Sequence, residues 1–274
     1  MAGWETLSKT PPTPKKAATK KPVVQQQTPK PPISNPFTPI KEAKKKRGIK
    51  LGIYGDYGTG KTHFALTAPP PVFVIDTELG AAPLAHNFSD KEIYVRELFK
   101  PEEERIEQDE VDSFIEIREH IDWLQKHPPK NGTVVVDSVT DLWKLTQSYG
   151  KVKIFGLSPT DRLRYQFDWG VINNLYQKMI VNLLSIPCNL ILTAKTQQVY
   201  QGANPTGKFQ PYWQKNTAYY VDLLIRNKRT IEKGESHFES EIEKCRLTKD
   251  LMGKIYKDLK FETIQQELKK YVGE

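Results

Sequence analysis

The chain has 274 residues, which suits one large domain with an additional segment rather than two full domains. No stretch approaches the roughly 18 apolar residues of a membrane span, and the first residues lack the basic and apolar parts of a signal peptide. Only two cysteines occur, Cys188 and Cys245, which argues against a disulfide framework and a cysteine-based zinc site. We therefore expect a cytoplasmic protein without a membrane partner.

The net charge of +8 belongs to the beginning of the chain. Residues 1–47 hold 11 Lys and Arg against 2 Asp and Glu, whereas the remaining residues hold 30 against 31. Nine of the 20 prolines also fall in this segment. The composition predicts a disordered, basic Pro/Lys-rich tail at residues 1–47 and a folded domain at residues 48–274. Two interpretations of the tail stay open: a solubilising segment, or a tether to the phosphates of nucleic acid.

The first expected element is a strand at residues 50–54, which leads into a glycine-rich segment. That segment matches G-x-x-x-x-G-K-[ST], the P-loop pattern, in which glycines let backbone N–H groups point at an anion. A helix expected at residues 63–68 adds its positive N-terminal end. Lys61 would reach the β- and γ-phosphates, and the Thr62 hydroxyl would bind Mg²⁺. The motif predicts binding of ATP and Mg²⁺ by Gly55, Asp56, Tyr57, Gly58, Thr59, Gly60, Lys61 and Thr62.

Two of the next expected strands end in carboxylates. Strands are expected at residues 72–75, 92–98 and 133–136, with a helix at residues 110–127. Ligands bind at the C-terminal ends of parallel strands. Asp137, directly after the strand at residues 133–136, is therefore a candidate Mg²⁺ ligand, and the alternative is an ordinary helix cap. Glu78, just after the strand at residues 72–75, is a candidate base that orients water, and the alternative is a surface carboxylate at a turn.

The second half of the chain continues the alternation. We expect a helix at residues 168–185, a strand at 189–193, a late antiparallel hairpin at 219–229 and 238–247, and a closing helix at 263–272. Strands that are solid apolar runs, separated by helices, predict an α/β fold. Its sheet would be mostly parallel and covered by helices on both faces.

The two strand ends together resemble those of the RecA/RadA recombinases. In that family the strand after the P-loop helix ends in a pattern like Ile75-Asp76-Thr77-Glu78, and the metal-binding strand resembles Val135-Val136-Asp137-Ser138. The likeness covers roughly residues 48–250. It is greatest to compact RecA-like ATPases of phages and prokaryotes, including the Sak-type single-strand annealing and recombination proteins. It implies a RecA-like P-loop NTPase core with Glu78 as catalytic base beside Lys61.

RecA-type proteins usually place a Gln after the fourth core strand, here the strand expected at residues 189–193, to sense the γ-phosphate. In this chain Thr193, Lys195 and Gln197 all stay open for that role.

The stretch that follows, residues 195–221, contains no Asp or Glu, and its glycines and prolines predict a loop. Rings and lysines on a loop suit single-stranded nucleic acid, because bases stack on rings while lysines follow phosphates. In RecA-like folds the loop after the fourth strand contacts DNA. The alternative is a lid or a subunit contact with packed rings. The predicted DNA contacts are Lys195, Tyr200, Lys208, Phe209, Tyr212, Trp213 and Lys215.

The resemblance thus implies an ATPase that is stimulated by single-stranded DNA and acts in recombination, annealing or repair. We expect a homo-oligomer, either a ring or a filament. Two alternatives stay open. One is a nucleotide-gated loader or scaffold with little ATP turnover, and the other is a different P-loop enzyme, such as a small-molecule kinase.

Overall fold

The computed structural model describes residues 37, 39, 47–98 and 106–272. The chain divides into two units, Met1–Pro39 and Ile40–Glu274, and the fold reported below belongs to the second. The tail predicted at residues 1–47 lies almost entirely outside the described residues, so its prediction stays a prediction.

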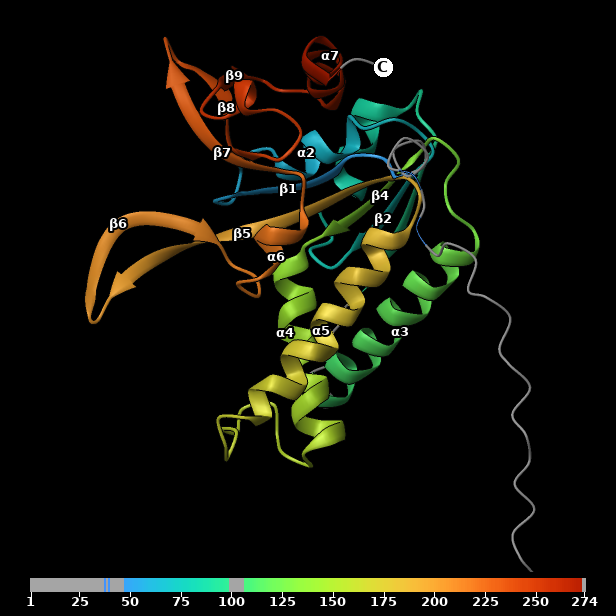
Figure 1. Cartoon of the computed structure of the whole chain (residues 1–274), viewed down its shortest axis with the longest axis vertical. Coiled ribbons are helices and arrows are strands. Elements are labelled where there is room, and N and C mark those ends of the chain that lie inside the picture. The colour runs from blue at the N-terminus through green and yellow to red at the C-terminus, as the bar shows by residue number, and fades with distance from the viewer. Residues whose placement is uncertain (1–36, 38, 40–46, 99–105, 273–274) are drawn as a thin grey trace, which may run out of the picture. The chain divides into compact units, whose positions relative to one another are not determined.

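A mixed sheet forms the centre of the described domain (Figure 1). Its strands follow the order β3-β2-β4-β5-β1-β7-β8-β9, and β6 pairs with β5. Pairing is parallel from β3 through to β7 and antiparallel at β7–β8, β8–β9 and β5–β6. The strands are β1 (Lys50–Gly55), β2 (Val72–Asp76), β3 (Ile93–Glu97), β4 (Thr133–Asp137), β5 (Asn189–Gln201), β6 (Asn204–Pro211), β7 (Leu223–Glu232), β8 (Glu235–Cys245) and β9 (Ile255–Lys257).

Helices cover both faces of this sheet. Three long helices lie side by side on one face, α3 (Ile106–Lys126), α4 (Val139–Tyr149) and α5 (Asp168–Ser185) (Figure 1). The other face carries α2 (Lys61–Leu66), the 3₁₀ segment η2 (Ala82–Phe88) and α7 (Phe261–Val272). Shorter turns are η3 (Gly150–Ile154), α6 (Thr217–Tyr220) and η4 (Lys249–Leu251).

The alternation of side chains along the strands explains the two layers. Val134, Val136 and Leu192 belong to the apolar core under α3, α4 and α5, whereas Val135 and Ile191 belong to the core under α2 and α7. A strand with apolar residues on both faces is buried on both faces. The predicted α/β class, the mostly parallel sheet and the late antiparallel hairpin are confirmed.

Parallel pairing brings the predicted functional positions to one edge of the sheet. The last residue of β2, Asp76, is paired with the last residue of β4, Asp137. Gly55, where the P-loop begins, is paired with Lys195 on β5. Residues that lie far apart in the sequence therefore meet at the C-terminal ends of the strands.

The loop predicted after residue 195 is a β-hairpin instead. β5 continues to Gln201 and turns through Gly202 and Ala203 into β6, which projects from the domain (Figure 1). Gly202 has φ 63°, a left-handed conformation that glycine adopts without a steric cost. Pro205 is tolerated because β6 pairs only with β5, so its missing N–H breaks no second ladder. The loop prediction was wrong because glycines and prolines mark hairpin turns and edge strands as well as loops.

Candidate functional site

The P-loop connects β1 to α2 in a curl that requires its glycines. Gly58 and Gly60 have φ values of 66° and 77°, and Gly60 directly precedes the first residue of α2. A Cβ on Gly55 would lie 2.4 Å from the carbonyl oxygen of Asn227 on β7. The Asn227 side chain also donates to the carbonyl oxygen of Thr59 at 3.1 Å. The loop is therefore held against β7, and its conformation requires glycine at positions 55, 58 and 60.

Lys61 lies inside this curl. Its Nζ donates to the carbonyl oxygens of Gly55 at 3.1 Å and Asp56 at 2.8 Å. Burial lowers the pKa of Lys61, and the nearby carboxylates of Glu78 and Asp137 oppose that shift. The ammonium therefore lies within the curl of the loop, where a bound phosphate would compete with these carbonyl oxygens for its hydrogen bonds.

Two residues of the loop differ in how far their side chains are exposed. Tyr57 is 96% exposed, whereas Thr59 is buried. The Thr59 hydroxyl donates to the carbonyl oxygen of Asp56 at 2.8 Å and closes the turn.

The Asp137 carboxylate accepts hydrogen bonds from two hydroxyl groups that belong to different elements. The Thr62 hydroxyl donates to Oδ2 at 2.6 Å, and the Thr193 hydroxyl of β5 donates to Oδ1. Burial raises the pKa of Asp137, and the two hydroxyl donors oppose the rise. The carboxylate therefore lies where α2, β4 and β5 meet.

The residues present fit Mg²⁺. That ion prefers oxygen ligands and is usually bound by one or two carboxylates together with substrate phosphates and water. Thr62 and Asp137 supply one hydroxyl and one carboxylate that already touch each other. Within the described ranges no group of three or more His, Cys, Asp or Glu residues could hold a metal ion by itself. A site completed by phosphate oxygens is consistent with both observations.

A buried carboxylate that the sequence analysis did not single out builds the turn that carries Glu78. Asp76 accepts backbone N–H groups from Glu78 at 3.0 Å, Gly80 at 3.3 Å and Ala81 at 2.8 Å. It has no exposed surface. Aspartate bonding to its own following backbone is the signature of an Asx-type turn. That pattern, an Asp at a strand end shortly before a Gly, was available in the sequence.

Glu78 lies beside a lysine from β5. The distance from Lys195 Nζ to Glu78 Oε1 is 3.4 Å, and Asp141 on α4 is 3.1 Å from the same ammonium. Burial alone would lower the pKa of Lys195, but Asp141 and Glu78 outweigh it and raise the pKa above its usual value. These residues surround a cavity of about 450 Å³, lined by Thr77, Glu78, Glu110, Asp141, Lys144, Leu145 and Lys195.

The three γ-phosphate sensor candidates now differ in position. Thr193 touches Asp137 and Lys195 touches Glu78, so both lie in the site. Gln197 points elsewhere, because its Nε2 donates to the carbonyl oxygen of Pro211 at 3.5 Å on the neighbouring strand. The structure brings together the first two and leaves Gln197 outside.

Most of the predicted DNA contacts are accessible on or beside the hairpin. Tyr200 is 59% exposed and Phe209 is 39% exposed, and Lys208 and Lys215 are exposed as well. The Arg226 guanidinium lies 5.2 Å from the centre of the Phe209 ring, which adds a cation that the sequence analysis missed. Together these side chains form an exposed surface of rings and positive charge.

Two predicted contacts are less accessible than the others. Trp213 is only 5% exposed, and its ring lies 2.7 Å from where a Cβ on Gly52 would be. The prediction of Trp213 as a DNA contact is therefore wrong, because its ring fills the core beneath the hairpin. Tyr212 is half-buried, and its carbonyl oxygen accepts the Thr140 hydroxyl at 2.7 Å.

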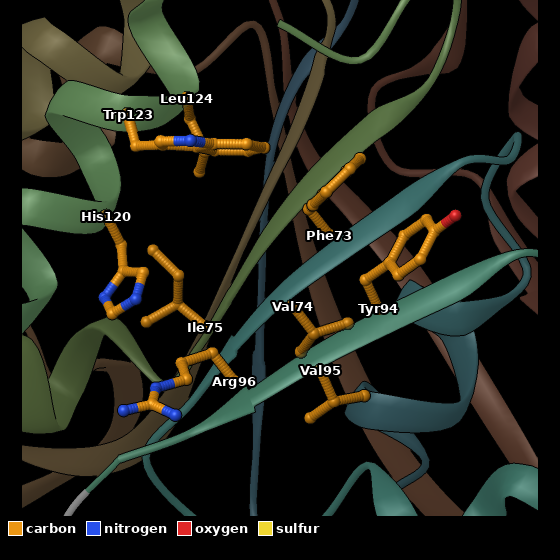
Figure 2. Close-up of a pocket in the computed structure, with 9 residues that line it drawn as sticks. All are labelled: Phe73, Val74, Ile75, Tyr94, Val95, Arg96, His120, Trp123 and Leu124. Atoms are coloured by element: carbon orange, nitrogen blue, oxygen red, sulfur yellow. The ribbon is translucent and has the colours of Figure 1, made fainter. Parts of the chain in front are cut away.

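A further apolar cavity of about 120 Å³ lies away from these residues (Figure 2). Rings of Phe73 on β2, Tyr94 on β3 and Trp123 on α3 surround it, and none of the predicted site residues contributes to its lining. It is therefore separate from the P-loop site.

Comparison with protein families decides the assignment. The model of the family described as AAA domain matches residues 47–250. The chain belongs to the AAA domain family. This AAA domain accordingly carries the fold of a P-loop ATPase, and nucleotide binding and hydrolysis are the activities that the family suggests.

Comparison with solved structures found a KaiC-like protein of the hyperthermophilic archaeon Pyrococcus horikoshii OT3. It is 18% identical, with a TM-score of 0.46 and coverage of 77% of this chain and 85% of that one. Comparison with curated proteins found no match. None of the helices in the described part of the AAA domain is long and apolar enough to cross a membrane.

Proposed function

We propose that this AAA domain binds ATP with Mg²⁺ and hydrolyses it to ADP and phosphate. Lys61 neutralises charge on the β- and γ-phosphates, and Thr62 and Asp137 hold Mg²⁺, which supplies further positive charge to the phosphates. Glu78 accepts a hydrogen bond from a water molecule and aims it at the γ-phosphorus. A bond forms from the water oxygen to phosphorus while the bond from phosphorus to the ADP oxygen breaks, and the proton that the water loses passes to the Glu78 carboxylate.

We also propose that the bound nucleotide controls binding of single-stranded DNA by the β5–β6 hairpin. The continuity of β5 carries this proposal. Thr193 bonds to Asp137, Lys195 pairs with Glu78, and the same strand then runs to Gln201 as one side of the hairpin. A change in the groups around the γ-phosphate therefore acts directly on the strand that forms the hairpin.

The chemistry of the hairpin supports DNA as its partner. Tyr200 and Phe209 offer ring faces for stacking of bases, and Lys208 and Arg226 offer charge for phosphates. No Asp or Glu interrupts residues 195–221. Stacking on rings tolerates any base, so the expected binding has little sequence preference.

The first prediction concerns Glu78. We expect Glu78→Gln to lower the rate of ATP hydrolysis by about 100-fold or more, because the amide cannot accept a proton from the attacking water. Binding of ATP should stay close to that of the unmodified protein. Phosphate release and binding of a fluorescent ATP analogue would measure the two effects. Hydrolysis at the original rate with normal binding would show that Glu78 is not the base.

The DNA function has a direct test of its own. Fluorescence anisotropy with labelled single-stranded DNA, with and without ATP, would measure binding, and the ATPase rate would measure stimulation. Light scattering on the same samples would test the homo-oligomer, ring or filament, that we propose for the active form. Stimulation together with large assemblies would support a role in recombination, annealing or repair like that of Sak-type proteins. Absence of DNA binding in both conditions would refute it.

A second function is favoured by one contact. The ion pair between Lys195 and Glu78 keeps the proposed base occupied, as expected of a nucleotide-gated loader or scaffold with little turnover. Slow phosphate release that DNA does not change would favour this second function.

A further inference from the structure

Two cavities flank the P-loop on β7 and β8, and their linings differ in chemistry. The cavity beside the start of the loop, of about 480 Å³, contains Arg226, Lys228 and Arg229. The cavity beside the end of the loop, of about 190 Å³, contains rings of His63 and Phe238. Three cations suit phosphate, whereas rings with a few polar groups suit a flat heterocycle.

The two cavities lie at opposite ends of the loop. Asp137 and Glu78, which mark the proposed γ-phosphate side, line neither of them. The smaller cavity touches Gly60 and His63 at the start of α2, whereas the larger one touches Gly55 and Asp56 at the start of the loop. The ring-lined cavity is therefore the one whose chemistry suits the nucleoside of a triphosphate held along the loop.

Phe238 is fixed at the edge of the loop. A Cβ on Gly60 would lie 2.8 Å from the Phe238 ring, so the ring packs directly on the P-loop backbone. The backbone N–H of Phe238 donates to Asp258 Oδ1 at 3.1 Å, and the N–H of Asp258 donates back to the Phe238 carbonyl oxygen at 2.8 Å. These two hydrogen bonds join Phe238 to Asp258, and Phe238 is only half-buried.

His63 supplies a second ring on the helix side. It lies against Phe88, with ring centres 5.2 Å apart. The imidazole lines the cavity together with the Phe238 ring and presents a flat surface to it.

We infer that this cavity receives the purine base of the bound nucleotide, with Phe238 and His63 contacting the base. The inference rests on the proposed binding of ATP and identifies the part of the chain that distinguishes a nucleotide from a bare polyphosphate. The Asp258 carboxylate also lines the cavity; its Oδ1 accepts the Phe238 N–H and its Oδ2 lies 3.3 Å from His237 Nδ1, so an amino group on the base would share these oxygens. Lys260 completes the polar rim.

The test compares two ligands on one protein. Affinities of ATP and of inorganic tripolyphosphate, both with Mg²⁺, are measured by calorimetry. We expect Phe238→Ala to weaken ATP binding by about tenfold, the loss of one stacking contact, and to leave tripolyphosphate binding unchanged. Phe238→Tyr should retain ATP affinity, because it keeps the ring. Phe167→Ala is the matched control, since that phenyl group is 72% exposed and lies outside the site.

Each other result has a defined meaning. Equal weakening of both ligands by Phe238→Ala, or no weakening of either, would overturn the inference while ATP binding itself stands. Equal affinities of the unmodified protein for ATP and tripolyphosphate would also overturn it, because the base would then contribute nothing. If the unmodified protein binds neither ligand, the proposed function fails and the inference fails with it.

Discussion

At the scale of single residues, the least expected feature of the site is the position of Lys195. One ammonium group lies between Glu78, which we propose as the base, and Asp141, which follows β4, the strand of the proposed Mg²⁺ ligand Asp137. The Lys195 side chain is 42% exposed and that of Glu78 is 27% exposed, so the pair is only partly shielded from solvent. A pair of this kind contributes about 1 kcal/mol or less. That is enough to restrain a carboxylate without preventing its release.

We therefore expect Lys195→Met to raise the basal rate of ATP hydrolysis, by up to about fivefold, because Glu78 is no longer held by a cation. The rate of phosphate release in the absence of DNA measures this. Lys144→Met is the control, since Lys144 also pairs with Asp141, at 3.4 Å, but has no ion pair with Glu78. A fall in the rate would contradict the prediction and would indicate that Lys195 contacts the phosphates instead.

At the scale of elements, the hairpin of β5 and β6 is the proposed output of the site. We expect the double variant Tyr200→Ala, Lys208→Ala to weaken single-stranded DNA binding by about tenfold or more, because one stacking ring and one phosphate contact are lost. The salt dependence of binding should also become shallower. The matched control is Ile231→Ala, Lys233→Ala, which removes one apolar side chain and one lysine near the turn of the β7–β8 hairpin. Equal weakening of DNA binding by the two variants in anisotropy measurements would show that binding does not depend on the β5–β6 hairpin in particular.

The same elements show how far the sequence alone could go. Local patterns predicted the core strands, because strands buried on both faces are continuous apolar runs. They missed α4, although Ser138 caps that helix by accepting the N–H of Asp141, a pattern of Ser followed by Asp three residues later. They also placed Trp213 on the surface. Its burial depends on contact with Gly52, far away in the sequence, and no local pattern carries that information.

At the scale of the whole molecule, the two apolar cores share only the sheet, and β1 lies at its centre between β5 and β7. Lys50, the first residue of β1, has no exposed surface. Its Nζ donates to the carbonyl oxygens of Ile186 at 2.7 Å and Cys188 at 2.8 Å, where α5 ends and β5 begins. The ammonium therefore joins the central strand to its neighbour, and it is exposed only when the sheet itself opens.

This position makes Lys50 a reporter of global unfolding. Burial lowers its pKa from 10.5 to about 8 in the folded protein. Because the folded pKa lies below the unfolded one, the unfolded chain binds the proton more tightly, and stability rises with pH between these values. From pH 7 to pH 9 this contributes about 1 kcal/mol to the free energy of unfolding. We expect Lys50→Met to lose that rise, whereas Lys178→Met, at an exposed lysine on α5, should keep it. Urea unfolding followed by circular dichroism at pH 7, 8 and 9 measures the slopes, and parallel slopes for all three proteins would mean that the Lys50 amine titrates alike in the folded and unfolded chains.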